Sequence, residues 1–100
     1  GGYNVYPKEV ESEIDELDGV NESAVIGVPH PDFGEAVVAA VVPKSGVTLE
    51  ADHIISSLQQ RLAKFKCPKM VFFVDALPRN TMGKVQKNEL RKTYANTFQA

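Results

Sequence analysis

The sequence predicts an α+β domain, in which a small sheet of about three mainly antiparallel strands packs against three helices. Three runs rich in β-branched and aromatic residues have the length of strands: SAVIGVP at 23–29, EAVVAAVV at 35–42 and MVFFVDAL at 70–77. Three other stretches carry apolar residues at helical spacing. In chain order the elements are helix, strand, strand, helix, strand and helix, which is typical of helices packed on one small sheet.

The first helix is expected to begin at Pro7, because proline suits the first helical turn, where its missing N–H costs nothing. Val10, Ile14 and Leu17 then recur on one face of the helix. Gly19 ends it, since glycine tolerates the backbone conformation that follows a helix C-terminus.

The first two strands are joined by HPDFG at 30–34, a turn sequence that predicts antiparallel neighbours. A second turn, PKSG at 43–46, leads away from the sheet. The run at 70–77 is apolar enough to predict a third strand that is buried at the centre of the sheet.

The second helix has the clearest apolar stripe, and Thr48 is expected to cap its start. Pro68 is expected to end it, and a last helix is predicted over 87–95 with Leu90 and Tyr94 facing inward. By this periodicity Phe65 is a core residue. The inward residues of the second helix are Ala51, Ile54, Ile55, Leu58, Leu62 and Phe65.

Length and composition fit one domain with one core, since the chain has 100 residues, 43% of them hydrophobic and 24% charged. No apolar run approaches the roughly 20 residues of a membrane-spanning helix, so no membrane partner is expected. The first residues lack the basic and apolar regions of a signal peptide. Because the chain starts on Gly-Gly without a methionine, we expect it to be part of a larger protein.

The single cysteine, Cys67, excludes an internal disulfide and is interpreted as a packing residue rather than a reactive thiol. One unpaired cysteine fits a reducing compartment, and a cytoplasmic location is expected. His30 and His53 share no ligand spacing with each other or with Cys67, so no metal site is predicted.

Charge is distributed unevenly along the chain, although the net charge is only −2. Residues 1–60 hold 11 acidic and 2 basic side chains, whereas residues 61–100 hold 9 basic and 2 acidic ones. Such asymmetry predicts a face that meets an anion, or lysines that only keep helices soluble. The second interpretation suits Arg61, Lys64, Arg91 and Lys92 best. No nucleic-acid partner is expected, because the chain is acidic overall and has no tryptophan.

The segment PRNTMGK at 78–84 is the clearest candidate for chemistry. A strand delivers it, Gly83 permits a tight turn with positive φ, and Lys84 then projects one ammonium from the surface. A phosphate-binding P-loop is excluded, because that motif needs glycine where Pro78 stands and serine or threonine where Val85 stands. A hairpin-like turn with a solvated lysine remains the alternative.

Two further segments are candidates for ligand contacts. Gly1 and Gly2 form a flexible turn that either lets the backbone approach a ligand or is a bare linker end. The cluster KFKCPK at 64–69 places cations around the aromatic ring of Phe65, a combination that grips nucleotides by stacking and phosphate contacts. Lys69 closes this cluster.

Three segments together resemble the small C-terminal domain of the adenylate-forming superfamily, which includes acyl-CoA synthetases, peptide-synthetase adenylation domains and luciferases. They are GGYNVYPKEVESEI at 1–14, AVIGVPHPDFGEAVVA at 24–39 and KFKCPKMVFFVDALPRNTMGKVQKNELR at 64–91. Their order and spacing match across nearly the whole chain. Within the superfamily, RLAKFKCPK and LPRNTMGKVQKNELR are most similar to malonyl-CoA synthetases.

The resemblance implies that residues 1–100 are the mobile C-terminal domain of an AMP-forming acyl-CoA ligase whose large N-terminal domain and hinge lie outside this chain. In such a ligase a small carboxylic acid and ATP form an acyl-adenylate and pyrophosphate, and the CoA thiol then displaces AMP. The resemblance to malonyl-CoA synthetases implies malonate as the acid. ATP, Mg²⁺ and CoA are expected in the full-length enzyme, whereas this fragment alone is expected to bind none of them and to be inactive.

The resemblance also implies roles for individual residues. Lys84 matches the catalytic lysine that bridges the acyl carboxylate and the α-phosphate during adenylation. The domain then rotates, so that Gly1 and Gly2 line the pantetheine channel, while Phe65 and Lys69 match residues that contact the CoA nucleotide in some ligases. This sequence departs from those ligases at Cys67, which stands where they carry an arginine that contacts a CoA phosphate.

In several bacterial members of the superfamily the lysine that matches Lys84 is acetylated by a protein acetyltransferase and restored by a deacetylase. Both enzymes are therefore expected as partners of this domain. Two alternatives stay open: an aryl- or fatty-acyl-CoA ligase of the same superfamily, and a free-standing interaction module without catalytic function.

Overall fold

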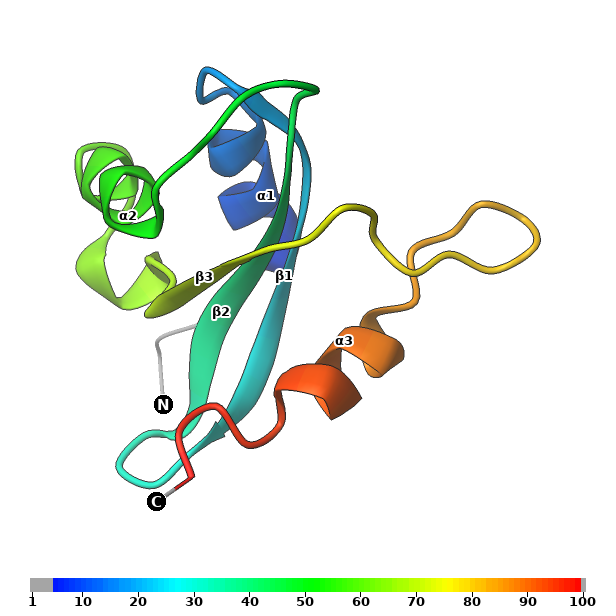
Figure 1. Cartoon of the computed structure of the whole chain (residues 1–100). Helices are drawn as coiled ribbons and strands as arrows, with labels where there is room; N and C mark the ends of the chain where they lie inside the picture. Colours follow the sequence, from blue (N-terminus) through cyan, green and yellow to red (C-terminus); the bar gives the residue numbers. More distant parts are fainter. Residues whose placement is uncertain (1–4, 100) are drawn as a thin grey trace.

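The predicted α+β architecture is confirmed by the computed structural model, which describes residues 5–99. Three helices and a three-stranded sheet occur in the predicted order (Figure 1). The elements are α1 (Pro7–Asp15), β1 (Val20–His30), β2 (Gly34–Pro43), α2 (Ala51–Gln59), the short 3-10 helix η1 (Lys64–Lys66), β3 (Met70–Phe73) and α3 (Lys87–Tyr94).

The sheet is mixed, with strand order β1-β2-β3. The antiparallel pairing of β1 with β2 confirms the hairpin predicted from the turn at 30–34. β3 pairs with β2 in parallel, from Val38↔Met70 to Val41↔Phe73. The connection through α2 allows this direction, because neighbouring parallel strands need a crossover of a dozen or more residues, usually a helix.

The prediction of a buried central third strand is wrong. β2 lies at the centre, whereas β3 is a four-residue edge strand in which only Val71 is buried. The apolar run at 70–77 has a different physical cause: its first part pairs with β2, and Leu77 is buried beyond the strand, in the core on the α3 face. Two separate burial sites therefore give one continuous apolar run.

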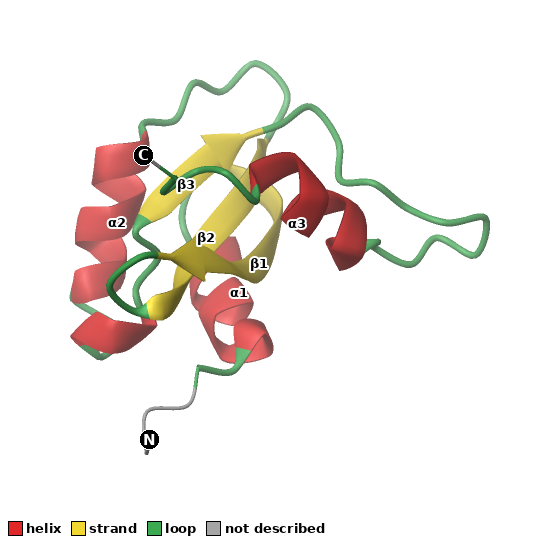
Figure 2. Cartoon of the chain, turned by 90° about the horizontal axis from the view of Figure 1, so that it is seen from below, coloured by secondary structure: helices red, strands yellow, loops and turns green. Residues whose placement is uncertain are grey.

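Helices cover both faces of the sheet (Figure 2). On one face α1 and α2 pack against odd-numbered residues of β1 and β2, such as Val25 and Val41. On the other face α3 packs through Leu90 against even-numbered residues, such as Ile26 and Val38. Burial on both faces explains why β2 is an almost continuous apolar run rather than an alternating one.

The second helix is shorter than predicted. α2 ends at Gln59, because the N–H groups of Gln60 and Arg61 bond to carbonyls only three residues back and the chain then turns. Phe65 consequently lies in η1 and is 43% exposed, so its assignment to the core is wrong. The expected Thr48 cap is also wrong, since Glu50 occupies the N-cap position without a side-chain hydrogen bond.

The two other helices agree closely with expectation. α1 begins at Pro7 and ends at Asp15, before Gly19, whose φ is +87°. α3 spans 87–94; Leu90 is buried, and the Tyr94 ring stacks on Phe72 with centroids 4.1 Å apart. None of the helices within residues 5–99 has the length and apolarity that a bilayer crossing requires.

Candidate functional site

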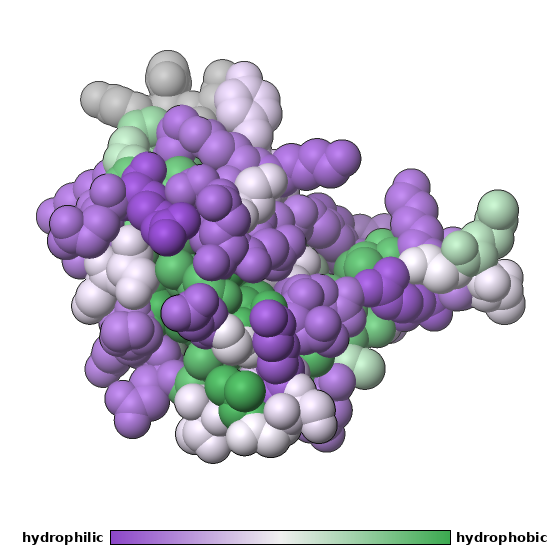
Figure 3. All heavy atoms as spheres, turned by 90° about the horizontal axis from the view of Figure 1, so that it is seen from above, coloured by the Kyte–Doolittle hydropathy of each residue, from purple (hydrophilic) through white to green (hydrophobic). Residues whose placement is uncertain are grey.

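Lys84 lies in a narrow loop that projects from the body of the domain between β3 and α3 (Figures 1 and 3). The two sides of the loop pair as in a hairpin, with an antiparallel bridge between Arg79 and Val85. The Asn80 N–H donates to the Lys84 carbonyl at 3.0 Å, and the Gln86 N–H donates to the Pro78 carbonyl at 2.8 Å. The segment is thus an ordered structure with its own backbone hydrogen bonds.

The turn at the tip of the loop is built by Asn80 and Gly83. The Asn80 side-chain oxygen accepts hydrogen bonds from the N–H groups of Met82 and Lys84, both at 2.9 Å. Gly83 has a φ of +83°, as the sequence predicted, which side chains with a Cβ rarely adopt. Nothing lies within 4 Å of the position that a Cβ would take at Gly83, so only the backbone conformation requires glycine here.

The backbone of Lys84 is fixed while its side chain extends into solvent. Its N–H and carbonyl are both held by Asn80, and the Gln86 side-chain amide donates a further bond to the Lys84 carbonyl at 3.0 Å. Among residues 5–99, none of the ion pairs includes Lys84. The loop therefore presents an ammonium whose charge is not neutralised within the described part of the domain.

Acidic side chains from the first part of the chain pair with basic side chains from the last part in the folded domain. Within residues 5–99, four of the five ion pairs join the acidic first part of the chain to the basic last part: Arg61–Glu13, Lys66–Glu9, Arg79–Glu22 and Lys87–Glu11. Of the basic side chains in residues 61–99, Lys64, Lys69, Lys84 and Arg91 take part in none of these five pairs, and Arg91 donates a hydrogen bond to Asn88 instead. These three lysines are the candidates for binding an external anion.

The acidic side chains are crowded where α1 meets β1. Burial raises the pKa of Asp15, as do the nearby carboxylates of Glu11 and Glu22, while a hydrogen bond from Ser23 opposes the shift. The Ser23 hydroxyl donates to Asp15 at 2.7 Å. The folded state therefore holds a proton on Asp15 more readily than the unfolded chain does.

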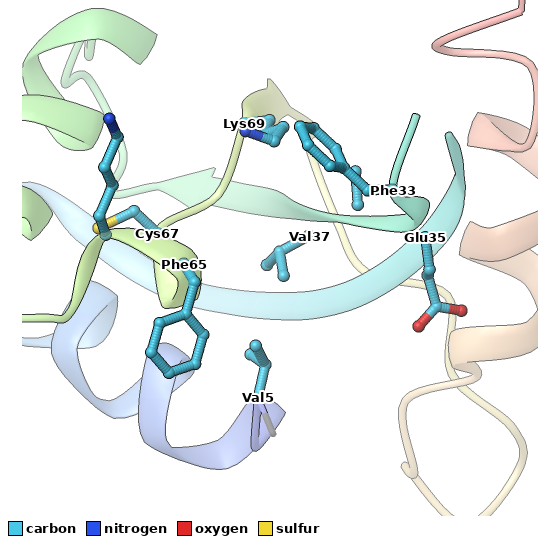
Figure 4. A pocket seen from close by; sticks show the side chains of 9 residues that line it. Val5, Phe33, Glu35, Val37, Phe65, Cys67 and Lys69 are labelled. Carbon is cyan, nitrogen blue, oxygen red and sulfur yellow. The ribbon is translucent and has the colours of Figure 1, made fainter. Parts of the chain in front are cut away.

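A second candidate site is an open cavity of about 640 Å³ between the β1–β2 turn, η1 and the start of β3. The cationic side chains of Lys64 and Lys69 line it, together with the rings of Phe33 and Phe65. Figure 4 shows Lys69 and the two rings at the cavity. The remaining lining residues are Val5, Glu35, Ala36, Val37 and Cys67. The cavity combines exposed rings with two lysines that form no ion pair among the described residues, which suits a ligand with an aromatic base and phosphate groups.

Phe33 and Lys69 form one contact unit at the rim of this cavity. The Lys69 ammonium lies 4.6 Å from the centroid of the Phe33 ring, within the range of a cation–π interaction. Phe33 also stacks on His30, with ring centroids 4.3 Å apart. His30 Nδ1 accepts the N–H groups of Asp32 and Phe33, which holds the turn closed. The ring under the Lys69 ammonium is therefore positioned by the turn itself.

The η1 side of the cavity is held by α1. The Lys66 ammonium pairs with Glu9 at 2.9 Å and lies 5.8 Å from the Phe65 centroid. Cys67 is buried, and this burial raises the pKa of its thiol, so the thiol stays protonated at neutral pH. This environment supports the interpretation of Cys67 as a packing residue.

The predicted site residues fall into two groups. Phe65 and Lys69 are brought together in the cavity, whereas Lys84 lies in the loop on the other side of the domain (Figure 1). Gly1 and Gly2 lie outside the described residues. Sequence reasoning missed Phe33, although an aromatic residue inside an otherwise polar turn is a usable signal for a surface contact.

The site offers no metal-binding cluster within residues 5–99, because no three His, Cys, Asp or Glu side chains are grouped to hold an ion. These residues therefore do not fit a Mg²⁺ ion by themselves. What they offer is cationic: one projecting ammonium and one cavity with two lysines.

Comparison with known protein families matches residues 9–84 to the AMP-binding enzyme C-terminal domain. A CoA ligase of Rhodococcus jostii, acting on a propanoyl chain with an indenyl ring system, is 58% identical over 92 residues, which cover 92% of this chain and 18% of that protein. Feruloyl-CoA synthase of Amycolatopsis is 46% identical over 94 residues, which cover 94% of this chain and 19% of that protein.

Solved structures are also similar to this chain over nearly its whole length. ATP-bound MatB from Rhodopseudomonas palustris superposes with a TM-score of 0.95 at 62% identity, over 99% of this chain and 20% of that chain. A fatty acyl CoA synthetase of Mycobacterium tuberculosis gives a TM-score of 0.86 at 45% identity, over 97% of this chain and 19% of that chain. The chain thus spans about a fifth of the length of the relatives it matches.

Proposed function

Because the chain belongs to the family of AMP-binding enzyme C-terminal domains within the adenylate-forming superfamily, we propose that it is the lysine-bearing domain of an ATP-dependent, AMP-forming acyl-CoA synthetase. The proposed reaction converts malonate, ATP and CoA to malonyl-CoA, AMP and pyrophosphate. The resemblance to malonyl-CoA synthetases and the 62% identity to MatB support malonate. The names of other relatives, such as feruloyl-CoA synthase, support an aryl acid as the second candidate.

The observation that carries the proposal is the ammonium of Lys84, which is exposed, held by its backbone and paired with no carboxylate in residues 5–99. In adenylation a carboxylate oxygen attacks the α-phosphorus of ATP, and pyrophosphate leaves. Negative charge gathers on the oxygens around phosphorus in the transition state. Lys84 would bridge those oxygens and the acyl carboxylate, and loss of such a donor typically costs about 10²–10³ in rate.

The cavity would serve the second step, in which the CoA thiol attacks the acyl carbonyl and AMP leaves. Lys69 and Lys64 would contact phosphate groups of CoA, and Phe33 and Phe65 would stack on its adenine. Glu35 also lines the cavity, and its carboxylate would repel phosphate. We therefore assign the phosphates to the Lys64 and Lys69 side of the cavity and away from Glu35.

A large N-terminal part of the same enzyme is the proposed partner, since the relatives extend well beyond the segment matched here. That part would supply the acyl pocket, the ATP-binding loop and the ligands of Mg²⁺, which residues 5–99 do not provide. This domain alone would therefore not catalyse either step.

Reversible acetylation of Lys84 is proposed as a means of regulation. The side chain is exposed on a projecting loop, where a protein acetyltransferase and a deacetylase have access. Acetylation removes the positive charge that the adenylation step requires. Incubation with an acetyltransferase and mapping by mass spectrometry tests this, and modification of other lysines but not Lys84 would refute it.

The proposed role of Lys84 is tested in the full-length enzyme by Lys84→Ala, with Lys44→Ala as a control at another exposed lysine in a turn. We expect Lys84→Ala to slow ATP–pyrophosphate exchange about 10²–10³-fold but to spare thioester formation from preformed acyl-adenylate and CoA. Normal exchange by Lys84→Ala refutes the role. A panel of malonate, feruloyl-type and fatty acids, measured with the unmodified enzyme, decides the acyl substrate.

A further inference from the structure

Arg79 joins the loop that carries Lys84 to the body of the domain by polar contacts, beside the apolar packing of Val85 on the α3-side core. The guanidinium of Arg79 forms an ion pair with Glu22 of β1, and it donates a hydrogen bond to the Gly83 carbonyl at 2.6 Å. The same group thus contacts both the sheet and the tip of the loop. Glu22 and Arg79 are 57 residues apart in the sequence.

Glu22 points to the loop side of the sheet because of an irregularity in β1. The register with β2 shifts between Val20 and Glu22. After this bulge, Ala24 faces the α3 core, whereas Val20 belongs to the α1 and α2 core on the opposite face. Since side chains alternate along a strand, Glu22 shares the face of Ala24, on which α3 packs.

The contact with Gly83 fixes one particular peptide plane, the one that joins Gly83 to Lys84. Its carbonyl oxygen accepts from Arg79, and its N–H donates to the Asn80 side chain at 2.9 Å. Glycine has no Cβ and restricts its backbone dihedral angles less than other residues do, so Gly83 itself imposes little preference on the orientation of the peptide that follows it. Rotation of the plane would redirect the Lys84 side chain.

We propose that Arg79, anchored by Glu22, is a positioning residue that locks the Gly83–Lys84 peptide and thereby aims the Lys84 ammonium during adenylation. This inference rests on the proposed catalytic role of Lys84. A guanidinium suits the task, because its planar fork serves two acceptors at once, whereas a lysine ammonium on a flexible stem lacks that geometry.

The test uses the full-length enzyme with Arg79→Ala, Arg79→Lys, Glu22→Gln and the double variant Glu22→Gln/Arg79→Ala. Arg61→Ala is the matched control, because it breaks another ion pair between the basic and acidic parts of the chain, with Glu13, outside the Lys84 loop. We expect Arg79→Ala to lower kcat for adenylation about ten- to hundredfold through misplacement of the ammonium. The KM for ATP and thioester formation from acyl-adenylate should stay unchanged, and Arg79→Lys should lie between the wild type and Arg79→Ala.

The coupling between the two residues provides a second readout. Glu22→Gln should slow adenylation in the wild-type background and have no further effect in the Arg79→Ala background, because its action passes through Arg79. The proposal would be overturned if Glu22→Gln and Arg79→Ala slowed adenylation independently, so that their effects multiplied in the double variant. It would also be overturned if Arg79→Ala slowed adenylation and thioester formation equally and lowered the unfolding temperature. Full adenylation by Arg79→Ala overturns the positioning role alone if Lys84→Ala is inactive, and an active Lys84→Ala overturns the proposed function itself.

Discussion

Replacement of Lys69 by glutamine gives the sharpest test of the cavity as the CoA nucleotide site. The Lys69 side chain lies at the cavity rim over the Phe33 ring, and residues 5–99 provide it with no ion pair. Its backbone N–H bonds to the Val37 carbonyl at 2.8 Å, and the substitution leaves this bond intact. The variant should therefore fold normally and lose only the charge.

The size of the effect follows from the exposure of the site. A hydrogen bond that involves a charged group contributes about 1.5–3 kcal/mol, and solvent and salt place an exposed contact at the lower end. A loss of about 1.4 kcal/mol corresponds to about a tenfold rise in the KM for CoA. Phe33→Leu removes the ring that contacts the Lys69 ammonium and that we propose to stack on the adenine. Loss of base–aromatic stacking costs about 1–3 kcal/mol, so its KM for CoA should rise about tenfold or more.

The assay is thioester formation from preformed acyl-adenylate by the full-length enzyme, with CoA or pantetheine as the thiol. Pantetheine lacks the nucleotide, so wild type and Lys69→Gln should use it equally well. Lys44→Gln is the control for a general loss of positive charge. An equal loss with both thiols, or no loss with CoA, would contradict the assignment of the cavity to the nucleotide.

Three further outcomes follow from single contacts. Asn80→Ala removes the acceptor of the Met82 and Lys84 N–H groups, worth about 1 kcal/mol at an exposed site, and should slow ATP–pyrophosphate exchange about fivefold in the full-length enzyme. Leu58→Ala empties a fully buried position between α2 and the sheet and should lower the free energy of unfolding by about 3–5 kcal/mol, measured by urea unfolding of this chain. Because the pKa of Asp15 is raised in the folded state, its ionisation costs stability as pH rises above 3.8, the ordinary pKa of an aspartate, so Asp15→Asn should be more stable than wild type at neutral pH. The greater stability of Asp15→Asn should disappear below pH 3.8. A stability difference that is independent of pH would contradict a raised pKa of Asp15 in the folded state.

Turn residues and the spacing of apolar residues predicted the parts of the fold that depend on neighbouring residues in the sequence. The turn at 30–34 predicted the antiparallel hairpin, and the apolar spacing in 87–95 predicted α3 to within one residue. The positive φ of Gly83 also follows from the chain itself, because a tight turn needs a residue without a Cβ. Each of these features depends on residues that are close together in the sequence.

The features that the sequence did not predict depend on distant contacts. The apolar stripe of the second helix continued to Phe65, but the chain leaves the helix at Gln59 and uses Phe65 at the surface of the cavity. The parallel pairing of β3 depends on the direction of the crossover, which no strand pattern encodes. The Arg79–Glu22 pair joins segments 57 residues apart, so no local pattern reveals it.

The distribution of charge links the fold to the proposed function. Acidic side chains from α1 and β1 neutralise Arg61, Lys66, Arg79 and Lys87, while the lysines of the cavity and the loop are left without such partners in residues 5–99. The η1 segment and the Lys84 loop lie on opposite sides of one small domain (Figures 1 and 2), so the cavity and the loop belong to different surfaces. If the loop serves adenylation and the cavity serves thioester formation, the domain has to reorient between the two steps. Ion pairs hold η1 and α3 to α1, and a further ion pair holds the Lys84 loop to β1. These contacts would allow the domain to rotate as one body.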